Sequence, residues 1–169
     1  MGRQRAGKDT AADYLSAHYG FVKMPLAGPV YGIARDVFGM VEKERGLLIQ
    51  IGVKMREIDP LVFPKALWRR LTGGITDPLP EGLRVVVSDA RFVNEWHFFK
   101  ERGGIAVRIL AARAVRAARP GYHAEYEHDA TETDLDGAPA DFVLVNESTL
   151  EDYYKALDEM MSKILADRT

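Results

Sequence analysis

The chain has 169 residues, 23 Lys and Arg side chains, 25 Asp and Glu side chains, and no cysteine. This length fits one compact domain, and the lack of cysteine excludes a disulfide scaffold, thiol catalysis and thiolate zinc sites. No apolar run approaches the roughly 18 residues of a membrane span, and no signal-like start is visible. We therefore expect a cytoplasmic protein with no membrane partner.

The net charge of −2 conceals an uneven distribution of charge along the chain. Residues 1–120 carry 20 basic and 12 acidic side chains, whereas residues 121–169 carry 3 basic and 13 acidic ones. Arginine, which outnumbers lysine by 15 to 8, is suited to planar recognition of phosphate or carboxylate. A basic portion of this kind fits either a nucleic acid or a small phosphorylated ligand, and composition does not choose between them.

The first half of the chain predicts mainly helices, from apolar spacings of three and four and from Gly and Pro at their ends. The predicted elements are a helix over 8–19, a strand over 21–24, helices over 30–38, 47–58 and 59–71, and an exposed loop over 72–82.

The second half alternates strands with helices. The predicted elements are a strand over 83–87, a helix over 93–102, strands over 105–110 and 141–146, and a last helix that starts with a capping box of Ser148 and Glu151. The strand over 83–87 is too apolar to face water, which is typical of parallel strands covered on both faces. The core stripe predicted for the last helix comprises Leu150, Tyr154, Leu157, Met161, Ile164 and Leu165. This alternation favours an α/β fold with a largely parallel sheet.

A phosphate-binding loop is indicated at the start of the chain. Residues 2–10 read Gly-Arg-Gln-Arg-Ala-Gly-Lys-Asp-Thr and fit the pattern G-x-x-x-x-G-K. Glycines let backbone N–H groups converge on phosphate oxygens, the following helix adds its positive end, and Lys8 would reach the β- and γ-phosphates. The residues predicted to bind ATP are Arg3, Gln4, Arg5, Ala6, Gly7, Lys8, Asp9 and Thr10.

Two features of this loop depart from the motif. Asp9 replaces the hydroxyl that usually binds Mg²⁺, so its carboxylate becomes a candidate metal ligand through water, while the Thr10 hydroxyl could contact a phosphate. The strand that precedes such loops is not found before Met1, so we expect a fold one strand short of this architecture. The alternative is a glycine-containing turn before an ordinary helix.

Polar residues follow the apolar strand predicted over 83–87. Residues 88–95 read Ser-Asp-Ala-Arg-Phe-Val-Asn-Glu. Ligands of open α/β sheets bind beyond the carboxyl ends of strands, so Asp89 is placed to engage Mg²⁺ or its water shell, and Arg91 to clamp an acceptor phosphate. The alternative is that Asp89 caps the next helix and Arg91 is a surface residue.

Together, the G-x-x-x-x-G-K-D-T and S-D-x-R-F-x-N-E motifs resemble those of the bacteriophage-type deoxynucleoside monophosphate kinases, relatives of adenylate kinase. Similar stretches extend over nearly the whole chain and comprise 24–29, 48–52 with Arg56, 103–109, His128 with Glu132, and 140–146. The resemblance implies one α/β domain over 1–169 with a three-layer P-loop kinase fold, in which helices flank a mostly parallel central sheet. It also implies acceptor-binding helices over 27–72 and a small lid over 111–136.

The activity that the resemblance implies is transfer of the γ-phosphoryl group of ATP to a deoxynucleoside monophosphate, with Mg²⁺ held at Asp9 and Asp89. The catalytic residues would be Lys8, Asp89, Arg91, Arg113 and Arg116. The residues expected to bind the acceptor are Arg56, Trp68, Arg91, Glu95 and Glu132. Phe63 and Trp68 are candidates to stack on the base, with the alternative that both pack in the core. A homodimer, and host cytoplasm if the gene belongs to a phage, are compatible with this family.

Residues 111–119 form an Ala-rich segment with an arginine at every third position. That spacing gathers Arg113, Arg116 and Arg119 along one face of a short helix, and mobile arginines that close over the transferred phosphoryl group lower its barrier. Arg113 and Arg116 are the predicted lid arginines, with a solvated basic face as the alternative, and Arg119 is expected only on such a face.

The segment over 120–136 is acidic and contains His123 and His128. Its spacing matches no metal-ligand pattern, so no metal site is predicted there. His128 and Glu132 are instead expected to order the returning arm of the lid.

Two other functions fit parts of the sequence. A kinase of the same fold could act on another phosphorylated metabolite, since animal-type phosphomevalonate kinase has a similar G-K-D loop and S-D-x-R element. The protein could also be an ATP-binding module associated with nucleic acid, because Arg3, Arg5 and the predicted lid arginines could contact a phosphate backbone. The sequence contains no recognised nucleic-acid motif and its net charge is slightly negative, so nucleic acid is not the expected partner.

Overall fold

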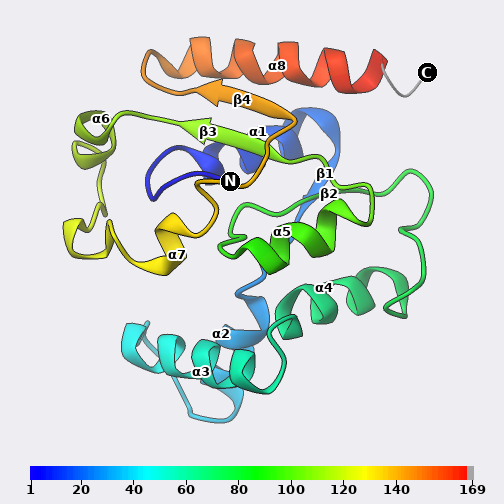
Figure 1. Ribbon diagram of the computed structural model, residues 1–169, viewed down its shortest axis with the longest axis vertical. Coiled ribbons are helices and arrows are strands. Elements are labelled where there is room, and N and C mark those ends of the chain that lie inside the picture. The colour runs from blue at the N-terminus through cyan, green and yellow to red at the C-terminus, as the bar shows by residue number, and fades with distance from the viewer. Residues whose placement is uncertain (167–169) are drawn as a thin grey trace.

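The computed structural model describes residues 1–166, in which helices alternate with short parallel strands (Figure 1). The elements are α1 (Lys8–Tyr19), β1 (Phe21–Lys23), α2 (Gly28–Asp36), α3 (Arg45–Ile58), α4 (Val62–Thr72), β2 (Arg84–Val86), α5 (Val93–Lys100), β3 (Val107–Leu110), α6 (Arg113–Ala117), the 3₁₀ helix η1 (Ala124–Tyr126), α7 (Ala130–Thr133), β4 (Phe142–Val145) and α8 (Leu150–Ala166). The α/β prediction is confirmed as a mixed α/β fold with parallel strands.

The start of α8 corrects one sequence prediction. Thr149 Oγ1 accepts from the backbone N–H of Asp152 at 3.1 Å and donates to the Asp152 carboxylate at 2.7 Å, so the predicted box of Ser148 and Glu151 is one residue too early. The predicted core stripe of α8 is confirmed in part: Leu157 and Met161 are buried, and Tyr154 and Ile164 pack against the same cluster. Leu150 and Leu165 are exposed instead, and the stripe also includes Tyr153 and Met160, which were not predicted.

The strands form two parallel pairs. β1 pairs with β2, with Val22 opposite Val85, and β3 pairs with β4, with Ile109 opposite Leu144. Met1 adds one ladder position to β3, because the Ile109 N–H donates to the Met1 carbonyl at 2.9 Å. Within residues 1–166, the single central sheet that was expected is therefore present as two separate strand pairs.

A cavity of about 550 Å³ lies between β2 and β3 and is lined by residues of both strands. Val85, Val86 and Val87 border this cavity and are only half-buried. Val86 packs against one hydrophobic core cluster and Val87 against another, so the prediction that this apolar run is covered on both faces is confirmed, while one edge of the strand opens onto the cavity.

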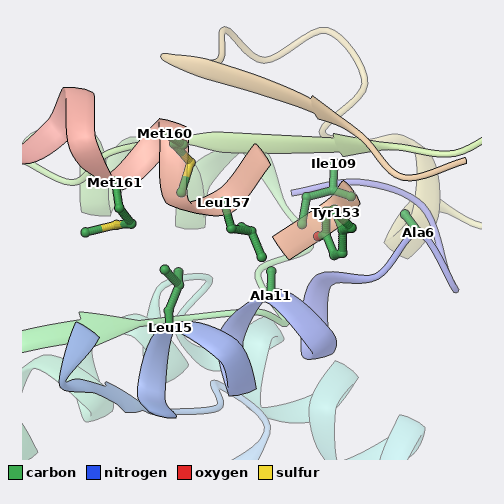
Figure 2. Packing of buried hydrophobic residues seen from close by; sticks show 8 residues of the cluster. All are labelled: Ala6, Ala11, Leu15, Ile109, Tyr153, Leu157, Met160 and Met161. Atoms are coloured by element: carbon green, nitrogen blue, oxygen red, sulfur yellow. The ribbon is translucent and has the colours of Figure 1, made fainter. Parts of the chain in front are cut away.

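One core cluster joins α1, α8 and β3. Leu157, on α8, is fully buried and points toward Ala11 on α1, while Ile109 comes from β3 (Figure 2). Ala6, in the loop ahead of α1, belongs to the same cluster and is also fully buried. The core therefore fixes the position of the loop that carries the phosphate-binding motif.

A second cluster packs α2, α3 and α4 at the other end of the molecule (Figure 1). Phe63 and Leu67 of α4 lie there against Ala34 of α2 and Ile51 of α3. Within residues 1–166, no helix has both the length and the apolar character needed to cross a membrane.

Candidate functional site

The loop over 2–7 is held in place by residues from the far end of the chain. The Asn146 side-chain amide donates to the Ala6 carbonyl at 2.8 Å, and the buried Tyr153 hydroxyl donates to the Gly7 carbonyl at 3.1 Å. Gly7 has a φ of 109°, and a Cβ added to it would lie 2.2 Å from Asn146 Nδ2. Glycine is thus required at this position both by its backbone conformation and by a close neighbour.

Gly7→Ala is expected to destabilise the protein by about 2 kcal/mol or more, because the alanine would combine a strained backbone with a clash against Asn146. The measurement is the free energy of unfolding in urea. Gly137→Ala is the matched control, since a Cβ there meets nothing within 4 Å. Equal losses for the two variants would contradict this account of the loop.

Lys8 is the first residue of α1, and its ammonium group lies inside the loop. The Nζ atom donates to the carbonyls of Gly2 and Arg3, at 2.7 and 2.8 Å. Burial lowers the pKa of Lys8 to about 8 and the Arg91 charge adds to this, while Glu132 raises it. A poorly solvated cation beside a helix N-terminus is suited to binding an anion.

The Glu132 carboxylate bridges the loop and a second cationic residue, Arg91. Glu132, on α7, accepts from the backbone N–H of Gln4 and from the Arg91 guanidinium group, and only 8% of its side chain is exposed. One carboxylate therefore bridges the loop and the segment that follows β2. The Gln4 side chain adds a second link between the loop and the segment over 120–136, because its amide donates to the His123 carbonyl at 2.7 Å.

The predicted lid arginines, Arg113 and Arg116, converge on Glu127. Arg113 Nε lies 2.7 Å from one carboxylate oxygen of Glu127, and Arg116 Nη2 lies 3.0 Å from the other. The Arg113 hydrogen bond, helped by Arg116, lowers the pKa of Glu127 to about 2, although burial acts in the opposite direction. Arg116 is buried and also donates to the Gln4 carbonyl at 3.4 Å, so it contacts the loop directly, whereas Arg113 is more exposed and is joined to Arg116 through Glu127.

Two further arginines join the segment over 111–136 to the loop. Arg119 donates to the carbonyls of Arg5 and Asn146, at 2.6 and 2.9 Å, so the expectation that Arg119 lies only on a solvated face is wrong. Arg3 pairs with Asp136 and donates to the Glu127 carbonyl at 2.7 Å. The sequence did give one indication that Arg119 belongs with the other two arginines, because an arginine stands at every third position over 113–119.

Asp9 and Thr10 lie in the first turn of α1, near the end of β2. The Ser88 hydroxyl donates to the Asp9 carboxylate at 2.8 Å, and the Lys23 ammonium group lies 3.0 Å from it. Burial raises the pKa of Asp9, but the hydrogen bonds from Ser88 and Lys23 outweigh this effect and lower the pKa below 3.8. The Asp9 side chain is largely exposed, so an ionised carboxylate is available beside the loop.

Asp89 follows β2 and binds backbone. Its two carboxylate oxygens accept from the N–H groups of Leu26 and Ala27, each at 2.9 Å. These groups directly precede α2, so Asp89 supports the start of α2; the alternative that it caps the next helix, α5, is wrong. Its predicted role toward Mg²⁺ stays a prediction.

Glu95 and Arg56 form an ion pair at the start of α5. The Glu95 side chain is 1% exposed, lies 3.1 Å from Arg56 Nη2 and accepts from the Arg91 backbone N–H at 2.8 Å. The Arg56 guanidinium group lies over the rings of Phe63 and Phe92, at 4.6 and 4.7 Å from their centroids. Arg56 Nε is buried and has no hydrogen-bond partner within residues 1–166.

Trp68 lies apart from these charged residues. Its indole N–H donates to the Asp77 carbonyl at 2.9 Å, and its ring packs edge-on against Phe98. Trp68 and Phe63 are both buried, which agrees with the alternative that both pack in the core. Phe63 contacts the Arg56 guanidinium group.

The structure thus brings most of the predicted phosphate-handling residues to one place. They are Arg3, Gln4, Lys8, Arg91, Arg113, Arg116 and Glu132. Among residues 1–166, no group of three or more His, Asp or Glu side chains could hold a metal ion by itself.

No family model matches this chain. A protein of Acanthamoeba polyphaga mimivirus is 27% identical to it over 189 residues, which cover 93% of this chain and 91% of that protein. The viral protein is named "Putative deoxynucleotide monophosphate kinase". This chain is similar to that protein over most of its length. The similarity supports a kinase at the level of the family.

Proposed function

We propose that this protein transfers the γ-phosphoryl group of ATP to a deoxynucleoside monophosphate, giving ADP and a deoxynucleoside diphosphate. The observation that carries the proposal is the grouping of cations around the loop over 2–7: Lys8 and Arg116 bind its carbonyls, and Arg91 is joined to it through Glu132. Phosphoryl transfer depends on positioning and on cationic groups around the transferred oxygens. The name of the mimiviral relative supports the same substrate class.

The same proposal includes the fold. The chain would form a single P-loop kinase domain over 1–169, with three layers, acceptor-binding helices over 27–72 and a lid over 111–136. The parallel strand pairs, the glycine-flanked loop ahead of α1 and the arginines of α6 support this assignment.

In the proposed reaction, an oxygen of the acceptor phosphate attacks the γ-phosphorus, and the bond to the oxygen that bridges the β- and γ-phosphates breaks. Lys8 would stabilise the charge that develops on ADP, and Arg113 and Arg116 would hold the equatorial oxygens. Arg91 and Arg56 would position the acceptor phosphate. Mg²⁺, when bound with ATP, neutralises phosphate charge, and Asp9 fits as its protein ligand because its carboxylate is ionised and exposed beside the loop.

A coupled assay that measures ADP release tests this function. The protein is incubated with ATP and Mg²⁺ and with each deoxynucleoside monophosphate in turn, and at least one acceptor is expected to give turnover above the rate without acceptor. No turnover with any of them would overturn the substrate assignment. Turnover with a phosphorylated metabolite that lacks a base would replace it with the metabolite-kinase alternative.

Glu132 holds a negative charge at the place that this proposal gives to a phosphate, so ATP must displace it. Glu132→Gln is expected to lower the Kd for ATP by about tenfold, because the neutral amide competes less well for Arg91 and for the Gln4 N–H. Isothermal titration measures the change. Glu125→Gln is the control, since Glu125 is an exposed lid residue that pairs with His123. A weaker affinity in Glu132→Gln would show instead that this carboxylate contacts the substrate.

The low pKa of Lys8 predicts how binding depends on pH. In the free protein the ammonium group loses its proton near pH 8. Phosphate binding requires the charged form, so the Kd for ATP is expected to be constant below this pH and to rise about tenfold per pH unit above it. Titrations from pH 6.5 to 9.5 provide the measurement, and a Kd independent of pH throughout would contradict the role of Lys8.

A further inference from the structure

Arg45 is the first residue of α3, which is an unfavourable position for a cation. The amino end of a helix carries a partial positive charge that repels other cations. The first turn of α3 contains no acidic residue that would offset this repulsion, and the side chain of Glu44, at the N-cap, forms no capping hydrogen bond. Local helix preferences therefore do not account for an arginine at this position, and its partners lie elsewhere in the fold.

Arg45 contacts the η1–α7 segment, which comprises residues 124–133. The Arg45 guanidinium carbon lies 3.7 Å from the centre of the Tyr126 ring, which is the geometry of a cation–π contact. The hydrogen bonds from Thr131 lower the pKa of Asp129, and the nearby charge of Arg45 adds to this effect. Figure 1 shows the segment and the first turn of α3 on the same side of the molecule. An aromatic ring and a carboxylate of one segment thus stabilise the Arg45 charge.

Backbone hydrogen bonds connect Tyr126 to Glu132 within this segment. The Tyr126 carbonyl accepts from the Asp129 N–H at 3.1 Å, and the Asp129 carbonyl accepts from the Glu132 N–H at 2.9 Å. The Asp129 carboxylate also caps α7, because it accepts from the Thr131 N–H at 2.8 Å. The segment is therefore an internally bonded unit, in which a shift of Tyr126 is transmitted to Glu132.

The Glu132 end of the η1–α7 segment contacts the phosphate-binding loop. Its carboxylate accepts from the Gln4 backbone N–H and from the Arg91 guanidinium group. The segment thus has one contact with α3, through Arg45, and another with the loop over 2–7. Because both contacts belong to one bonded unit, their free energies are coupled, and each contact raises the population of the other.

We propose that Arg45 is a positioning residue for the loop over 2–7, because its contact with Tyr126 holds the Glu132 carboxylate against the Gln4 N–H and Arg91. An anion that takes the place of Glu132 then has to work against the Arg45 contact as well. The occupancy of the loop by its own carboxylate is thus set in part from α3. This inference concerns contacts within the chain and does not depend on the kinase activity proposed above.

Hydrogen exchange of the Gln4 N–H, followed by NMR, tests the proposal, because this group donates to Glu132. In Arg45→Gln it is expected to exchange about fivefold faster, which corresponds to the loss of one cation–π contact. The Tm should not change, since the substitution also removes a cation from the start of a helix. Arg35→Gln is the matched control, because Arg35 is an exposed residue of α2 that pairs with the neighbouring Asp36.

Binding of inorganic pyrophosphate provides a second readout. Pyrophosphate competes with Glu132 for the loop, so its Kd in Arg45→Gln is expected to fall by about the same factor by which the Gln4 exchange rate rises. Tyr126→Leu should reproduce both changes. The double variant should exceed neither single variant, because the two substitutions remove the same contact.

An unchanged Gln4 exchange rate or an unchanged Kd for pyrophosphate in Arg45→Gln would overturn the proposal. Additive effects of Arg45→Gln and Tyr126→Leu would also overturn it, since they would show that the two residues act separately. A lower Tm with faster exchange along the whole chain would assign Arg45 to overall stability instead. A lack of kinase turnover, by contrast, would overturn the proposed function and leave the exchange measurements unaffected.

Discussion

Replacement of Lys8 by methionine is expected to lower kcat for phosphoryl transfer by about 10³-fold, since it removes the cation at the centre of the loop and leaves a side chain of similar length. The buried ammonium group is already poorly solvated, as its pKa of about 8 indicates. The variant should therefore remain folded, with its circular dichroism unchanged. The measurement is the rate of ADP formation at saturating ATP and acceptor.

Lys155→Met is the matched control for this experiment. Lys155 lies on the exposed side of α8 and pairs with Glu151, one turn earlier on the same helix. It should retain the full rate. If the Lys8 and Lys155 variants had equal rates, the loop would not be the site of phosphoryl transfer.

Replacement of Glu95 by alanine is expected to destabilise the protein by about 3 kcal/mol, because it leaves the Arg56 guanidinium group partly buried without its counter-ion. It also removes the acceptor for the Arg91 N–H at the start of α5. The measurement is the free energy of unfolding in urea at pH 7. Glu95→Gln keeps an oxygen acceptor and should fall between the wild-type chain and the alanine variant.

Glu151→Ala is the reference for this prediction, since it breaks an exposed ion pair on α8. Such pairs contribute about 0–1 kcal/mol, so the loss should stay below that of Glu95→Ala. A loss for Glu95→Ala as small as that of the surface variant would show that Arg56 finds other partners or water.

The parts of the site that the sequence could predict are those encoded by neighbouring residues. The loop over 2–10 and the polar run after β2 each bring their chemistry within one short stretch of chain, and the fold only has to place the two stretches together. Lys8 and Arg91 were predicted in this way. A helix start was also predicted for α8, but Ser148 and Thr149 are equally able to cap a helix, and only the geometry selects Thr149.

The contacts that the sequence could not predict join distant residues. Asn146 binds the Ala6 carbonyl across 140 positions, and no local pattern marks an asparagine at the end of a strand as a support for the loop. The acidic segment over 120–136 is a similar case. Its composition gives the sign of its charge, but the pairing of Glu127 with the lid arginines and of Glu132 with Arg91 depends on how an irregular chain folds back.

If the loop binds ATP as proposed, the position of Glu132 determines how strongly it can do so. Because this carboxylate belongs to the same chain as the loop that it contacts, its effective concentration there is set by the connecting segment and is independent of protein concentration. Short connections of this kind correspond to effective concentrations on the order of millimolar. The Glu132 carboxylate therefore competes with the nucleotide for the loop at every protein concentration. Substitutions that destabilise α7 would then lower the Kd for the nucleotide, although no residue of the loop is changed.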